Sequence, residues 1–386
     1  MNTFPFPAAS KDAWQKRFTK ELKDLDPTIL SQRSSAEEIN VPPYWSEGEV
    51  SVHDLSGILP NKSKNEWLQT FLVTPETTNE EVLYALNCGS NSLVVAVNVD
   101  LQKVLQGVNL GIISTHIEVL NLEEFSQKLK LYEKEITAKN LTFGLSNSHA
   151  FGSNIASSLG CCSIDVHVDE LHFAGANVIF ETAVALAKAL EVYFSLPVEI
   201  AKEFLLPRFR FNVGTDYFLE IARLRAFRVL WANIAKEIGI NGIAFIDART
   251  SIRELATTDE DSNLLRLTTM AMAAACGTAD SISVASHKRK VDHSSIRLAQ
   301  SIHNILIAEG IFHQSIDPSF GAYYIEAFTE EVMNKVWEKF LWIQSLGGYS
   351  NAELAIKEEV ARIDAIRKAD FASGKVVKVG VNKYKG

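Results

Sequence analysis

Residues 207–231, with the sequence PRFRFNVGTDYFLEIARLRAFRVLW, set the strongest constraint on how this chain can fold. Alternating aromatic side chains in 208–213 predict a β-strand that turns its rings to one face. A polar turn follows, in which Thr215 or Asp216 can cap the next helix through a side-chain oxygen. The helix places apolar residues on one face, and its arginines leave that face at Arg223, Arg225 and Arg228. One strand, one short loop and one long helix form the unit of an α/β barrel.

The unit repeats along the chain. Eight apolar, β-rich runs are spaced as strands, at residues 67–73, 92–97, 117–120, 141–145, 163–168, 208–213, 242–247 and 281–284. Helical patterns separate most of them, at 79–87, 101–106, 123–138, 177–194 and 294–309, while the connection at 146–159 offers only a short helical stretch. Strict alternation with eight repeats predicts an α/β fold of the closed (β/α)8 TIM-barrel type.

The sequence on either side of the barrel predicts extensions. Residues 1–65 are expected to form an arm, with an amphipathic helix at 12–25 and an extended segment that carries Tyr44 and Trp45 after two prolines. The barrel is expected at 66–320. Residues 321–386 are expected to add helices and a tail that pack on the barrel, with helices at 325–346 and 351–371 and an extended tail at 375–385.

Composition narrows the classes of function. A net charge of −9 over 386 residues and the lack of a basic stripe argue against a nucleic-acid partner. No run of 18 apolar residues occurs, which argues against a membrane span, and no signal peptide is seen, so a cytoplasmic location is expected. The four cysteines lack C-x-x-C spacing, so neither a zinc site nor a redox pair is indicated.

In a barrel of this type the site lies at the carboxyl ends of the strands. Asp165, His167 and Asp169 could be metal ligands, but paired polar groups are the commoner explanation for such residues. An acid–base group at the mouth could combine Glu170, His172 and Arg249, and an inert, mutually paired cluster is favoured over it. No glycine-rich phosphate loop is present. The residues alone therefore predict a barrel with an undefined site.

Several motifs go further, because they resemble the signatures of methylmalonyl-CoA mutases. They are FNVGTDYFLEIA with RAFRVLW at 211–231, DPSFGAYYIE at 317–326, SLGG at 345–348, VGVNKY at 379–384, AGA at 174–176 and PPY at 42–44. The resemblance implies an adenosylcobalamin-dependent isomerase that interconverts methylmalonyl-CoA and succinyl-CoA. Its barrel is threaded by the CoA tail, and a separate C-terminal domain binds cobalamin. In bacteria the family often forms a heterodimer in which one of two homologous chains is catalytic.

Departures from the family pattern lie at the mouth. The tyrosine and histidine that contact the thioester in catalytic chains fall on Asp169 and Glu170, and the motif against the cobalamin face begins with Ala248 and Arg249. The first strand lacks the expected arginine and tyrosine. The only Asp-x-His, at residues 165–167, has a glutamate where the cobalt-binding loop requires glycine. The resemblance therefore implies no catalytic, cofactor or metal residue in this chain.

The resemblance and its departures together predict the non-catalytic small (beta) subunit of this family, represented by its barrel. The partner would be the large (alpha) subunit in a heterodimer, and that partner would bind adenosylcobalamin. Tyr44 and Trp45 in the arm are expected to contact the large subunit. Two alternatives remain: an acyl-CoA mutase barrel that pairs with a separate cobalamin-binding chain, and a stand-alone acyl-CoA binder.

Overall fold

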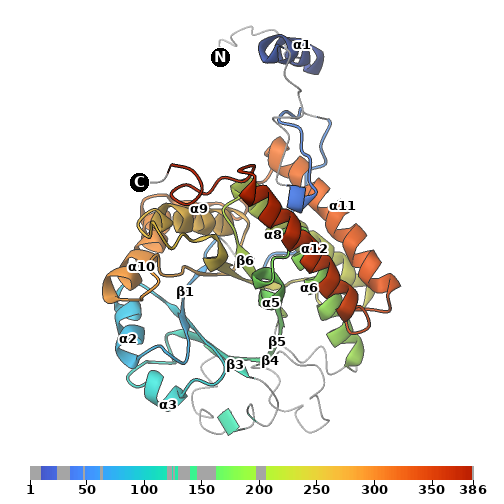
Figure 1. Cartoon of the computed structure of the whole chain (residues 1–386). Helices are drawn as coiled ribbons and strands as arrows, with labels where there is room; N and C mark the ends of the chain where they lie inside the picture. The colour runs from blue at the N-terminus through green and yellow to red at the C-terminus, as the bar shows by residue number, and fades with distance from the viewer. Residues whose placement is uncertain are drawn as a thin grey trace, which may run out of the picture.

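The barrel predicted from the sequence is present in the computed structural model, which describes residues 10–23, 35–46, 48–60, 64–119, 124, 127–128, 140–145, 162–196 and 206–384 (Figure 1). Eight parallel strands follow one another in chain order and close when the eighth pairs with the first. They are β1 (Leu68–Val73), β2 (Ser92–Val95), β3 (Ser114–Val119), β4 (Leu141–Leu145), β5 (Cys162–His167), β6 (Arg208–Val213), β7 (Phe245–Thr250) and β8 (Ser281–Ser283).

Helices surround the barrel and extend past it (Figure 1). They are α1 (Lys11–Leu22), α2 (Asn79–Asn87), α3 (Leu101–Val104), α5 (Asp169–Phe173), α6 (Val178–Ser195), α8 (Tyr217–Glu237), α9 (Asn263–Cys276), α10 (His293–Ala308), α11 (Tyr323–Ser345) and α12 (Glu353–Ala372), with short 3-10 turns η2 (Ser35–Glu37), η6 (Ile252–Glu254) and η7 (Phe312–Gln314). The sequence did not predict α5 or α9. The predicted helix at 123–138 lies almost entirely outside the described residues, and the connection at 146–159 lies wholly outside them.

Two strands begin three residues away from their predicted starts. β3 begins at Ser114 rather than at residue 117, because its polar first residues pair with β2 and β4. β7 covers Phe245–Thr250 rather than residues 242–247, because Phe245 N donates to Pro207 O and sets the register of β7 against β6. As a result Ala248 and Arg249, which were expected beyond the strand, lie within it.

The outer face of β6 and the inner face of α8 form the centre of the core. Phe209 packs against Phe227 and Trp231 with ring centroids 4.6 and 4.9 Å apart, and Phe211 lies 4.9 Å from Phe227. Asp216 rather than Thr215 caps α8 by accepting from Leu219 N. The predicted strand–turn–helix unit is therefore confirmed.

The arginines of α8, which were expected off the apolar face of the helix, do not lie on a solvent-facing side. All three are buried, because α11 packs as an outer layer over α6 and α8 and leaves α8 no solvent-facing side there. Each arginine has acidic partners, all of them buried except the half-buried Asp317: Glu181 at 2.7 Å and Glu220 at 3.2 Å for Arg223, Glu326 at 2.7 Å and Asp317 for Arg225, and Asp280 at 2.8 Å for Arg228. A buried charge is tolerated when it is paired and hydrogen-bonded in this way.

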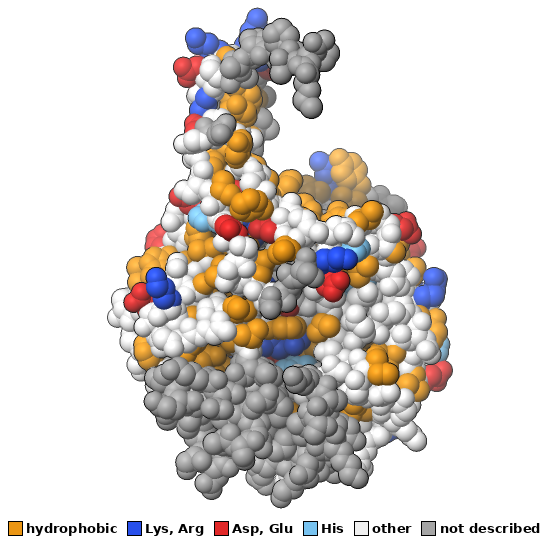
Figure 2. Space-filling view, turned by 180° about the vertical axis from the view of Figure 1, so that it is seen from behind, with side chains coloured by type: hydrophobic (Ala, Val, Ile, Leu, Met, Phe, Trp, Pro, Cys, Tyr) orange, Lys and Arg blue, Asp and Glu red, His pale blue; other side chains and the backbone are white. Residues whose placement is uncertain are grey.

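The N-terminal arm projects from the body of the molecule, with α1 at its far end (Figure 1). None of the residues of α1 is buried. Its apolar side carries Trp14 stacked on Phe18 and on Tyr44, with ring centroids 4.5 and 4.7 Å apart. Figure 2 shows hydrophobic side chains along the stalk that joins α1 to the body.

The C-terminal tail differs from the expectation. Residues 375–384 form turns held by an isolated bridge between Val379 and Lys383, not an extended strand. Among the described residues, no helix combines the length and the apolar composition needed to cross a membrane.

Candidate functional site

The centre of the barrel is filled by paired charges instead of apolar layers. Arg210 on β6 donates to Glu118 on β3, lies 3.1 Å from Asp169 just past β5, and lies 3.4 Å from Asp247 on β7. Arg249 on β7 lies 3.0 Å from Glu118 and 3.3 Å from Asp247. Two arginines and three carboxylates, which lie on or just past β3, β5, β6 and β7, therefore form one network of ion pairs.

A second polar group lies beside this network, on the β3–β5 side. His116 Nε2 is 2.7 Å from Asp165 Oδ2, and Ser163 Oγ donates to the other oxygen of Asp165 at 2.6 Å. His167 lies 3.5 Å from the same carboxylate. Gly144 on β4 makes room for the pair, since a Cβ there would overlap the Asp165 carboxylate and the His116 ring.

The charges in the barrel interior hold one another in their ionised forms. Burial opposes ionisation of Glu118, but Arg210 and Arg249 outweigh burial and keep the pKa of that carboxyl below its usual range. The same balance against three arginines keeps the pKa of Asp247 low. Burial and the Arg210 guanidinium lower the pKa of His167, which therefore stays neutral at pH 7. The interior carboxylates are thus ionised and paired with arginines, and they are poorly suited to proton transfer near neutral pH.

The predicted mouth positions occupy three different settings. Asp169 accepts from Asn212 Nδ2 at 2.7 Å and pairs with Arg210 inside the barrel, whereas Glu170 is exposed. Arg249 points inward to the paired network. Ala248, between two inward residues of β7, is fully buried in the core between strand and helices, so it does not face the mouth as expected.

The acid–base group suggested by the sequence is not assembled in this form. His172 forms hydrogen bonds with Glu181 at 2.8 Å and with Ser251 at 2.7 Å, while Glu170 and Arg249 lie in other environments. The Ser251–His172–Glu181 chain has the order of a hydrolase triad, but Ser251 and Glu181 are fully buried and His172 is 1% exposed. A substrate cannot reach this serine, so the chain of bonds joins β7 to α5 and α6 as a structural link.

The suggested metal ligands likewise do not form a site. Asp165 and His167 are engaged with His116 and each other, and Asp169 is engaged with Arg210. Within the described ranges, no group of three or more His, Cys, Asp or Glu side chains is arranged to hold a metal ion.

Sequence reasoning missed the partners that close the barrel interior. Glu118, Arg208, Arg210 and Asp247 alternate with apolar residues along their strands, and this period of two was the available signal for inward charges. Nothing local marked Glu181 or Ser251.

Two arm residues were expected to meet a partner. Tyr44 stacks on Trp14 of α1, and Trp45 packs partly buried against the main core and donates to Pro42 O at 3.0 Å. Trp45 therefore anchors the arm on the body of its own chain, and Tyr44 belongs to the projecting part.

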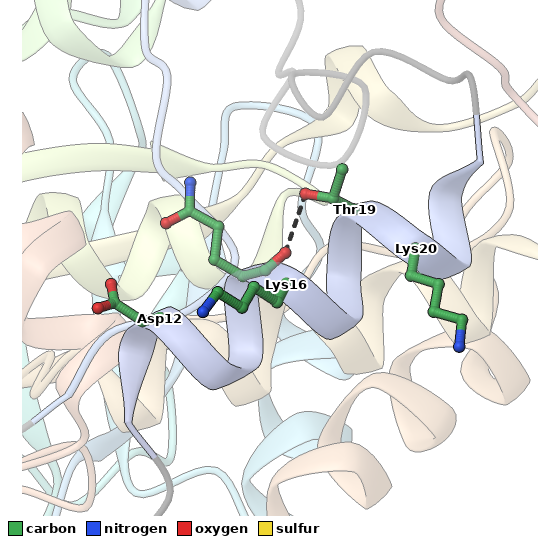
Figure 3. A pocket seen from close by; sticks show the side chains of 5 residues that line it. Asp12, Lys16, Thr19 and Lys20 are labelled. Carbon is green, nitrogen blue, oxygen red and sulfur yellow. Dashed lines mark hydrogen bonds between the residues drawn. The ribbon is translucent and has the colours of Figure 1, made fainter.

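A hollow of about 540 Å3 lies along the polar side of α1, lined by Asp12, Gln15, Lys16, Thr19 and Lys20 (Figure 3). Thr19 Oγ1 donates to Gln15 O at 2.9 Å, as the dashed line shows. All five lining residues come from one exposed helix, so in the described part of the chain this hollow lacks an opposing wall.

The sequence of this chain is similar to those of known proteins. The family model for methylmalonyl-CoA mutase matches residues 146–386. The methylmalonyl-CoA mutase small subunit of Porphyromonas gingivalis is 28% identical over 98% of this chain and 70% of its own length. The small subunit of Streptomyces virginiae is 26% identical over 80% of this chain and 56% of its own length.

The large subunit of Porphyromonas gingivalis is 31% identical, but over 58% of this chain and 33% of its own length. The small subunit of the same organism thus matches a greater part of this chain than the large subunit does. The family match covers well over half of the sequence, including the β6–α8 unit and the C-terminal helices. The chain belongs to the methylmalonyl-CoA mutase family.

Proposed function

We propose that this chain is the non-catalytic small (beta) subunit of an adenosylcobalamin-dependent methylmalonyl-CoA mutase, and that it supports a large (alpha) subunit in a heterodimer. The large subunit would bind both adenosylcobalamin and the acyl-CoA and would carry out the isomerisation. The observation that carries the proposal is the interior of the barrel, where Arg210, Arg249, Glu118, Asp169 and Asp247 pair with one another.

Paired charges in the barrel interior disfavour a threaded CoA tail. A pantetheine chain would have to displace ion pairs that are buried, and separating a buried pair leaves an uncompensated charge. At the mouth, the Asp169 carboxylate is likewise engaged, because it pairs with Arg210 and accepts from Asn212 Nδ2. Both features support a chain that does not turn over acyl-CoA.

The one position in the described residues that the family motif would assign to cobalt does not fit the cofactor. When bound, adenosylcobalamin supplies the radical that starts the isomerisation. In the family motif a histidine of an Asp-x-His loop would bind cobalt, and here that histidine is His167. Its ring lies inside the barrel, with Nδ1 3.3 Å from Arg210 and Nε2 3.5 Å from Asp165. We therefore assign the cofactor to the partner.

The arm, residues 1–65, supports the proposed assembly. A half-buried aromatic stack of Trp14 and Phe18 on the projecting helix α1, with Tyr44 of the following segment, is the kind of surface that a protein interface covers. We propose that this stack contacts the large subunit. Residues 66–320 would be the supporting barrel, and residues 321–386 would pack on it.

The test is co-expression with the large mutase chain of the same organism, followed by size-exclusion chromatography and a succinyl-CoA isomerisation assay. The expected result is a 1:1 complex whose activity is unchanged when Arg210→Met and Glu118→Gln are introduced together in this chain. Binding of acyl-CoA by this chain alone, without a complex, would instead support a stand-alone binder. Turnover by this chain with a separate cobalamin-binding protein would support the split-mutase alternative.

A further inference from the structure

A cleft of about 700 Å3 lies between the barrel loops and α12, away from the barrel interior. Its walls come from α5 and the following loop, the first turns of α6 and α8, η6, α12 and the C-terminal tail. Two aromatic residues line it with much of their surface open to solvent, Phe173 at 51% exposed and Phe371 at 36%. Val178 and Leu219 add apolar surface from the two helix starts. A cleft with apolar walls and a few converging polar groups is the usual form of a small-molecule site.

Three cations converge on one carboxylate in the lining of this cleft. Arg253 and Arg367 each lie 3.3 Å from Glu254, and Lys378 lies 3.7 Å from it. Burial opposes ionisation of Glu254, but the cations outweigh it and lower the pKa of that carboxyl. Burial and the neighbouring arginines lower the pKa of Lys378, although Glu254 opposes them. Three cations thus share the Glu254 carboxylate, with Glu37 3.6 Å from Arg367 and the buried Glu181 4.0 Å from Arg253 as the further acidic neighbours of the group.

Apart from Glu37, which lies beside Arg367, the other acidic side chains of the lining have partners outside this group. Asp216 caps the start of α8, Glu220 is bound to Gly214 N and Arg223, Asp364 pairs with Lys368, and Asp370 pairs with Lys375. Two long helices, α6 and α8, also begin at the cleft and direct the positive ends of their dipoles toward it. An incoming oxyanion would find its partner in the Arg253–Arg367–Lys378 group.

We propose that this cleft binds a small molecule that carries one oxyanion, a carboxylate or a phosphate, on an apolar body. The oxyanion lies among Arg253, Arg367 and Lys378, and the apolar body lies against Phe173 and Phe371. The proposal concerns this chain alone and does not depend on the large subunit.

Glu37 ties the cleft to the N-terminal arm. It lines the cleft from η2, accepts from Val178 N at 3.2 Å and lies 3.6 Å from Arg367. Burial raises the pKa of its carboxyl to about 7, with Glu220 and Glu181 adding to the effect and Arg367 and Val178 N opposing it. An oxyanion beside Arg367 favours the protonated form of Glu37, so binding takes up a proton and tightens as pH falls from 8 to 6.

Isothermal titration calorimetry on the full chain tests this proposal with three probes: 4-phenylbutyrate, phenyl phosphate and the neutral 4-phenylbutan-1-ol. We expect saturable 1:1 binding of at least one anion and weaker binding of the alcohol by about tenfold or more. The preferred anion distinguishes a carboxylate site from a phosphate site. Arg367→Gln and Lys378→Gln should each weaken anion binding about tenfold.

Three further variants test whether binding occurs in this cleft and depends on its own charged groups. Lys357→Gln removes an exposed cation of α12 outside the cleft lining and should leave binding unchanged. Ala174→Trp fills the cleft from an exposed loop position while keeping every cation, and should abolish binding. Glu37→Gln should remove the tightening at low pH. Failure of both anions to bind, equal binding of the alcohol, or binding that survives Ala174→Trp would each overturn the proposal.

Discussion

At the scale of single residues, a charged barrel interior depends on space as much as on charge. Gly144 on β4 sits where any Cβ would overlap the Asp165 carboxylate and the His116 ring. The His116–Asp165 pair is buried, and Ser163 donates to the same carboxylate. Glycine at this position in the barrel wall thus leaves room for the hydrogen-bonded contact between His116 and Asp165.

Gly144→Ala tests this relation. The added methyl group must push Asp165 or His116 out of place, so we expect a loss of stability of about 1–3 kcal/mol in urea unfolding. Gly57→Ala is the control, because its Cβ would meet nothing within 4 Å, and it should change stability by less than about 0.5 kcal/mol. Equal effects of the two substitutions would show that the fit around Gly144 has no energetic role.

Glu37 predicts a pH dependence of stability. Burial raises its pKa from 4.5 to about 7, so the folded chain holds this proton more tightly than the unfolded chain. The stabilisation is complete below pH 4.5 and is lost as the pH rises through 7. Glu37→Gln keeps an acceptor for Val178 N but cannot ionise.

We therefore expect the stability of Glu37→Gln to increase relative to the parent chain by about 1–3 kcal/mol between pH 5 and pH 8. Urea unfolding at a series of pH values measures this difference. A difference that is constant with pH, or one that is largest at pH 5, would contradict the buried state of the carboxyl.

At the scale of elements, α8 joins three parts of the molecule through its arginines. Arg223 reaches α6, Arg228 reaches the segment before β8, and Arg225 reaches the Asp317 loop and α11. These are structural ion pairs under an outer helix layer. They explain why an apparently polar side of a helix lies in the core.

Arg225→Met should cost about 3–5 kcal/mol, because Asp317 and Glu326 would lose their common cation while Glu326 remains fully buried. The triple variant Arg225→Met, Asp317→Asn, Glu326→Gln removes the charges together and should recover most of the loss. Chemical denaturation measures both. Lys357→Met, at an exposed pair on α12, is the control and should not shift the unfolding midpoint. A triple variant as unstable as the single one would show that packing, not charge, is what Arg225 supplies.

The same elements show what the sequence could and could not predict. Strand–helix alternation was sufficient for the barrel, and α2 has the predicted limits, 79–87, with a capping box of Thr78 and Glu81 at its start. The limits of β7 were not predictable from its apolar pattern, because pairing with β6 sets them. Arg210 and Glu118 are 92 residues apart, so no local pattern could join them. The site depends on such pairs across the barrel, which only the closed fold brings together.

At the scale of the whole molecule, α1 of the arm is expected to matter for assembly with the partner more than for the stability of this chain. No residue of α1 is buried, so its aromatic stack contributes little to the fold of this chain. The rings of this stack are half-buried, and aromatic side chains supply much of the energy of protein interfaces. The stack should therefore matter when a partner covers it.

The variant Trp14→Ser with Phe18→Ser tests this separation. We expect urea unfolding of the isolated chain to be unchanged. We expect the affinity for the large subunit, measured by surface plasmon resonance with purified subunits, to fall by at least about tenfold. Phe194→Ser is the control, since it removes an aromatic side chain that is 71% exposed at the end of α6, away from the arm. Loss of stability without loss of affinity would place α1 in the fold of this chain, whereas loss of affinity with intact stability supports an arm that acts in the heterodimer.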